Sequence, residues 1–122
     1  MLKKIVIPFL LLCLFYSKAD ATHLMGGEIT WQCQGNGSYI FTVKLYRDCN
    51  GSVGEDSITV YVFNNPALDS MRLGVVTRND ISPNCNPSGP VISCKAAENS
   101  NTPIAGAVQE AVFKSNPIFL SG

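Results

Sequence analysis

The chain has 122 residues, which is enough for one domain at most. Nine basic and nine acidic residues give a formal net charge of zero, so nucleic acid and anionic membranes are not expected partners. The chain has one histidine, and its acidic residues show no recognisable catalytic spacing. We therefore expect neither an enzyme nor a cofactor.

The first 21 residues predict a secretory signal peptide. Lys3 and Lys4 supply a positive segment, residues 5–15 form an apolar run, and Ala19-Asp20-Ala21 matches the small-x-small cleavage pattern. The apolar run is too short to cross a bilayer, which takes about 20 residues. Cleavage after Ala21 leaves a mature domain, residues 22–122, with six basic and eight acidic residues and a net charge of −2.

The beginning of the mature domain predicts a β-hairpin. Apolar and polar residues alternate over 28–33 and again over 39–46, and the Gly/Asn-rich segment 35–38 between them favours a turn. A turn near the middle of that segment pairs residue i with residue 72 − i, so that Cys33 faces Tyr39.

Further short strands are expected downstream, and together they predict an all-β fold. The segment 80–102 has the prolines and glycines of a loop, and the apolar triplet 118–120 predicts the start of another strand. We expect an Ig-like antiparallel β-sandwich over residues 22–122, truncated at its C-terminal end. The other expected strands are 57–63, which is apolar on both faces and thus favours a central position, 71–77, and 106–113, where a strand is favoured over a short helix.

Four cysteines of the mature domain predict two disulfides, since their number is even and the compartment is oxidising. Cys85 and Cys94 enclose a Pro/Gly-rich loop that can fold back, which favours their pairing and leaves Cys33 with Cys49. The hairpin register opposes that second pair, because it places Cys49 near His23, far from Cys33. A crossed set of pairs therefore stays open. A metal site is not expected, because no C-x-x-C spacing is present.

Two ligand-binding hypotheses follow from the side chains. A loop cluster of oxygen-bearing residues is a candidate for calcium, although its spacing fits no EF-hand and solvated loop residues are the simpler interpretation: Asp48, Asn50, Glu55 and Asp56. An aromatic stripe is a candidate for carbohydrate, although packing explains it more simply: Trp31, Tyr39, Phe41 and Tyr46. Asn36 and Asn50 each begin an N-x-S sequence, which suits both glycosylation and a turn.

Two motifs of the hairpin carry a family resemblance. The opening is His23-x-x-Gly-Gly-Glu-Ile-Thr-Trp-x-Cys33, and the second strand ends in Tyr-Arg-Asp-Cys at residues 46–49. The chain resembles the N-terminal module of the gliding-motility-associated large surface proteins of gliding bacteria. The segment 84–114, with two cysteines and Ala-Val-Gln-Glu at 107–110, is similar more loosely and has Ala111 where the family has an aromatic residue.

The resemblance implies a non-enzymatic, exported cell-surface module with a structural or adhesion role, in a longer protein with PKD or Ig-like repeats and a type IX secretion signal. Its implied partners are surface polysaccharide or other cell-surface proteins. A chain without the sorting domain would stay in the periplasm after export. The alternative is a small secreted domain that binds carbohydrate or calcium on its own.

Overall fold

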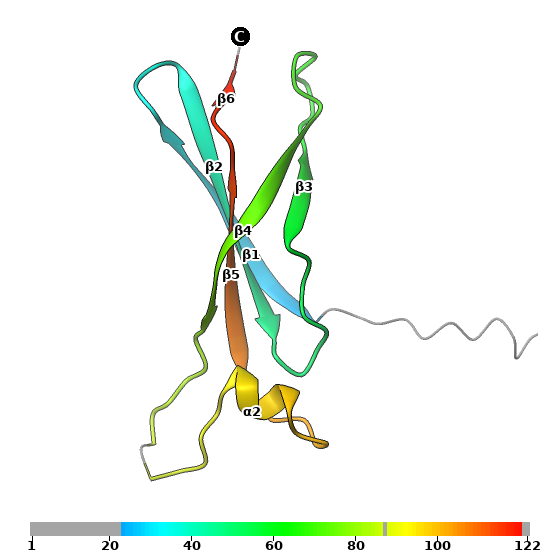
Figure 1. Cartoon of the computed structure of the whole chain (residues 1–122), viewed down its shortest axis with the longest axis vertical. Helices are drawn as coiled ribbons and strands as arrows, with labels where there is room; N and C mark the ends of the chain where they lie inside the picture. Colours follow the sequence, from blue (N-terminus) through cyan, green and yellow to red (C-terminus); the bar gives the residue numbers. More distant parts are fainter. Residues whose placement is uncertain (1–22, 87, 121–122) are drawn as a thin grey trace, which may run out of the picture.

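The computed structural model describes residues 23–86 and 88–120, so the predicted signal peptide lies outside the described residues. These residues form an elongated, curled sheet of six antiparallel strands (Figure 1), and the predicted all-β class is confirmed. The elements in chain order are β1 (Leu24–Cys33), β2 (Ser38–Asp48), β3 (Ser57–Tyr61), β4 (Ser70–Asp80), α2 (Cys94–Glu98), β5 (Val108–Ser115) and β6 (Ile118–Phe119).

Strands β1 and β2 form the predicted hairpin in the predicted register. Cys33 pairs with Tyr39, and the pairing continues in step until a register shift between Leu24 and Gly26. The turn is closed by Asn36, whose Oδ1 accepts hydrogen bonds from the backbone N–H and the hydroxyl of Ser38. The glycines on either side of Asn36 have φ values of 80° and 83°, which other residues rarely adopt.

The sheet is completed by a strand that comes late in the chain. The strand order is β1-β2-β5-β4-β3, so β5 lies between the hairpins β1–β2 and β3–β4, while β6 pairs with the beginning of β2 (Figure 1). The apolar triplet after Pro117 therefore does enter a short strand. Strand β3, by contrast, lies at the edge of the sheet, and its predicted central position is wrong. Ile58 and Val60 pack on the core, but Tyr61 on the other face is 70% exposed.

Within residues 23–86 and 88–120 the strands belong to one sheet, and the two packed sheets of the predicted sandwich are not seen. The sheet curls and buries its own inner face, because an apolar sheet face must be removed from water. The buried residues of this main core come from β2, β4 and β5: Val43, Met71, Leu73, Ala111 and Phe113.

A second, smaller core lies at the end of the sheet that carries α2 (Figure 1). It consists of Cys49, Cys94, Ala97 and Ala107. Helix α2 falls in the segment predicted as loop, and Ser93 caps it by accepting a hydrogen bond at Oγ from the N–H of Ala96. In the described part of the chain, no helix has the length and apolar character needed to cross a membrane.

Candidate functional site

The Tyr-Arg-Asp-Cys motif lies where β2 meets the second core, and its arginine is a buried hub of hydrogen bonds. Arg47 is 6% exposed. Its Nε donates to Oε1 of Gln109 on β5 over 2.9 Å, and its Nη2 donates to Oε1 of Glu98 on α2 over 2.8 Å. Its Nη1 donates to the carbonyl oxygens of Gly51 and Ser52. One guanidinium therefore fixes a strand, a helix and a loop relative to one another.

The two residues that flank Cys49 hold the loop after β2. Oδ1 of Asp48 accepts hydrogen bonds from the backbone N–H and Nδ2 of Asn50, and these bonds lower the pKa of Asp48, the backbone N–H contributing most. Asn50 also pairs with the backbone of Ile104, since its Oδ1 accepts from the N–H and its Nδ2 donates to the carbonyl oxygen. The amide of Asn50 is thus engaged in folding, which opposes glycosylation at this position.

The disulfide of the structure joins Cys49 to Cys94, with their Cα atoms 5.0 Å apart. The favoured pairing of Cys85 with Cys94 is therefore wrong, and so is the pairing of Cys33 with Cys49. Cys94 opens α2, and its N–H donates to Oδ2 of Asp80 at the end of β4 over 2.7 Å. Because β4 and β2 both end beside the start of β5, this contact places Cys94 at the end of the sheet where Cys49 lies, a long-range effect with no local sequence signal. The described residues leave Cys33 and Cys85 as exposed, unbonded cysteines.

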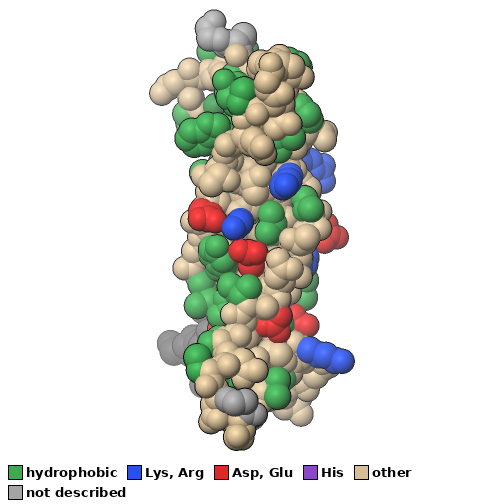
Figure 2. Space-filling view, turned by 90° about the vertical axis from the view of Figure 1, so that its left-hand side faces the viewer, with side chains coloured by type: hydrophobic (Ala, Val, Ile, Leu, Met, Phe, Trp, Pro, Cys, Tyr) green, Lys and Arg blue, Asp and Glu red, His purple; other side chains and the backbone are tan. Residues whose placement is uncertain are grey.

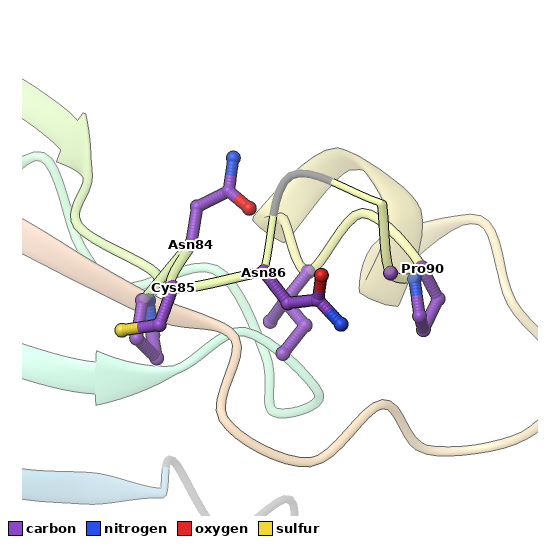
Figure 3. Close-up of a pocket in the computed structure, with 7 residues that line it drawn as sticks. Asn84, Cys85, Asn86 and Pro90 are labelled. Atoms are coloured by element: carbon purple, nitrogen blue, oxygen red, sulfur yellow. The ribbon is translucent and has the colours of Figure 1, made fainter.

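A shallow hollow lies in the loop between β4 and α2. Its lining includes Asn84, Cys85, Asn86 and Pro90, and its volume is about 270 Å³. In Figure 3 the sulfur of Cys85 points away from Asn86 and Pro90. Asn86 forms the turn itself, since its carbonyl oxygen accepts from the N–H of Gly89. The hollow is thus a by-product of the turn, with no charged side chain in its lining.

The outer face of β1, β2 and β5 carries a ladder of charges. Nζ of Lys44 lies 3.3 Å from Oε1 of Glu28, its pairing neighbour on β1, and 3.7 Å from Oε2 of Glu110 on β5. The hydrogen bond to Glu28, with the charge of Glu110 beside it, raises the pKa of Lys44. All three side chains reach water, so the ladder orders the surface more than it stabilises the fold.

The face of β1 that continues the core side of the sheet is also exposed to solvent. All ten residues of β1 are exposed. Ile29 and Trp31 are opposite Val43 and Phe41 on the core face of the sheet, yet they are 49% and 68% exposed. The expected burial of Trp31 in a core is therefore wrong, although Trp31 does lie opposite Phe41 across the hairpin. A small hollow of about 240 Å³ is lined by Ile29, Thr30 and Trp31. Elsewhere, apolar side chains are spread along the visible long face, with charged groups around its middle (Figure 2).

The remaining predicted ligand residues do not come together as a site. Asp56 forms an ion pair with Arg78 over 2.9 Å, while Asp48 and Asn50 bond to each other. Among the described residues, no three His, Cys, Asp or Glu side chains lie close enough together to hold a metal ion. Phe41 packs against the main core, while Trp31, its pairing neighbour on β1, is exposed. His23 lies exposed just before β1.

Sequence reasoning quoted Arg47 as part of a motif but missed its role, together with Gln109, Glu98 and Asp80. The one local signal is the position of Arg47 in its strand. Alternation places this charged residue on the core face, where a buried charge requires a partner. Comparison with known proteins adds no further support, since no family model, no curated protein and no solved structure matches this chain.

Proposed function

We propose that this protein is a non-enzymatic module of an exported cell-surface protein, with a structural or adhesion role of the kind found in gliding-motility-associated surface proteins. The observation that carries the proposal is the exposed strand β1, ten residues long, on a sheet braced at one end by Arg47 and a disulfide. A rigid sheet with an open strand offers a surface for contact with another macromolecule.

Several features support export and this family. The sequence begins with a predicted signal peptide, and a disulfide such as Cys49–Cys94 persists in oxidising compartments. Arg47 of the Tyr-Arg-Asp-Cys motif donates a hydrogen bond to Gln109 of the later motif, and the next two residues of the motif, Asp48 and Cys49, bond to Asn50 and Cys94. In the β-sandwich form of this proposal, a second sheet supplied by a longer chain packs against the sheet described here.

The proposal is tested on intact cells that produce the protein. Protease added outside the cells should digest the chain, and a strain that lacks it should adhere less to a solid surface. A chain that is fully protected in intact cells, but digested once the outer envelope is opened, would contradict the surface role.

Carbohydrate binding is a second candidate, because Trp31 is exposed on an open strand and a Trp ring can stack on a sugar. A glycan array tests it, with Trp31→Ala as the matched variant. Binding that survives this substitution, or no binding at all, would exclude a sugar site at Trp31. The calcium alternative has less support, since Oδ1 of Asp48 bonds to Asn50 and Oδ1 of Asp56 pairs with Arg78.

A further inference from the structure

Strand β1 forms one edge of the sheet, and this edge has few of the features that protect edges from pairing. Edge strands are commonly blocked by proline, by charges or by a bulge. Between Leu24 and Cys33 there is no proline, and the only charged residue is Glu28. The register shift lies at the far end, between Leu24 and Gly26. Among residues 23–86 and 88–120, only β2 pairs with residues 27–33, so their other edge can accept another strand.

The register shows which backbone groups face the open edge. The N–H of Gln34 donates to the carbonyl oxygen of Ser38 over 2.9 Å, which makes these two residues a hydrogen-bonded pair. Hydrogen-bonded and non-hydrogen-bonded pairs alternate along an antiparallel ladder. Thr30 is then bonded to β2, and the N–H and C=O groups of Ile29 and Trp31 are directed away from β2, toward the open edge.

The side chains along β1 complement a second copy of the same strand. An antiparallel neighbour centred on Thr30 pairs Ile29 with Trp31 of the second copy, and the same pair recurs by symmetry. Both pairs use the outward backbone groups, and both cover apolar side chains that are about half or more exposed. Glu28 lies opposite Gln32 of the second copy, so no like charges meet. Centring on Ile29 instead would place Trp31 opposite Gly27 and leave the indole without an apolar partner.

We propose that a second copy of this chain docks on strand β1, antiparallel and centred on Thr30, so that two sheets join into one. This inference goes beyond the proposed function and concerns the purified protein alone. If the purified protein fails to dimerise, the proposed surface role is not affected. If the chain is protected from protease on intact cells, the proposed dimer is not affected.

The intrinsic fluorescence of the protein probes this surface directly, because Trp31 is its only tryptophan. The protein is purified after export by its own N-terminal segment and diluted from about 1 mM to about 1 μM, a range that spans weak and moderate dimers. We expect the Trp31 emission to shift to longer wavelength and acrylamide quenching to increase on dilution, while sedimentation equilibrium shows the mass halving. A monomer at every concentration overturns the proposal. So does a Trp31 that is shielded at every concentration, which would place another segment or partner on β1.

A cross-link tests the centre of the pairing. Thr30→Cys is made in a chain whose Cys33 and Cys85 are serine, and oxidised glutathione supplies the oxidant, so that two thiols form one disulfide and two glutathione thiols are released. Directly opposed residues of a non-hydrogen-bonded pair have Cα atoms about 4.5 Å apart, within disulfide range. Thr59→Cys on the other edge strand, β3, is the control.

We expect covalent dimer to form roughly tenfold faster or more with Thr30→Cys than with Thr59→Cys, because association raises the local thiol concentration. Equal rates overturn the proposal. Trp31→Lys gives a second readout, since it places a charge against the apolar pair while the exposed side chain leaves the monomer fold intact. This variant should remain monomeric with an unchanged circular dichroism spectrum, and a folded variant that dimerises as the wild type does also refutes the inference.

Discussion

Replacement of Arg47 by methionine should destabilise the protein strongly, because the side chain is buried and serves several acceptors. The substitution keeps most of the apolar stem but leaves the side-chain oxygen of Gln109 and the carbonyl oxygens of Gly51 and Ser52 without their donor. Each lost bond costs about 1 kcal/mol. The ion pair with Glu98 adds less than about 1 kcal/mol, because the Glu98 side chain is 40% exposed.

The expected loss for Arg47→Met is therefore about 3 kcal/mol in the free energy of unfolding. For a domain of this size, that loss lowers the melting temperature by roughly 12–24 °C. Urea unfolding followed by circular dichroism measures the free energy directly. Arg72→Met is the control, since Arg72 bonds, within the part of the chain that the structure describes, to the surface hydroxyl of Ser57 alone and should cost no more than about 0.5 kcal/mol. An Arg47→Met variant as stable as the control would refute the role of the hub.

Three further predictions concern backbone packing, the disulfide and acid stability. A Cβ on Gly27 would lie 2.8 Å from the carbonyl oxygen of Lys44, whereas one on Gly26 meets nothing within 4 Å, so in thermal unfolding Gly27→Ala should cost about 1–3 kcal/mol and Gly26→Ala almost nothing. Serine in place of both bonded cysteines should cost up to about 4 kcal/mol, since the bond spans 45 residues, while serine in place of the two exposed cysteines should leave the urea midpoint unchanged. Hydrogen bonds from the hydroxyl and N–H of Ser82 and from the N–H of Cys94 lower the pKa of Asp80, so its contribution is complete above about pH 4 and is lost as the pH falls through the folded-state pKa. Asp80→Asn should accordingly flatten the acid side of a stability-against-pH curve, and an unchanged slope would contradict this assignment.

The hairpin β1–β2 could be predicted from sequence because its determinants are local. The turn residues stand next to one another, and alternation sets the faces, so the pairing of Cys33 with Tyr39 follows from counting. The strand boundaries of β4 and β5 are also close to expectation for the same reason. What alternation cannot show is the position of a strand within the sheet, and the edge position of β3 was missed because a mostly apolar run suits either place.

The contacts around Arg47 could not be predicted, because they join segments far apart in the chain. Gln109 lies 62 residues from Arg47, and Glu98 lies 51 residues away on a helix that the loop composition concealed. The same helix brings Cys94 to Cys49, whereas the short loop between Cys85 and Cys94 suggested a nearer partner. The exposure of Trp31 could not be predicted from the sequence either, since an aromatic residue on the core side of a strand is usually buried.

Residue-resolved amide hydrogen exchange of β1 tests most directly whether its open edge is an interface between copies of this chain. The N–H groups of Ile29 and Trp31 face that edge, whereas the N–H of Thr30 is bonded within the hairpin. We predict that exchange at Ile29 and Trp31 slows as the protein concentration rises, while exchange at Thr30 stays constant. Exchange at Ile29 and Trp31 that is independent of concentration would contradict the account.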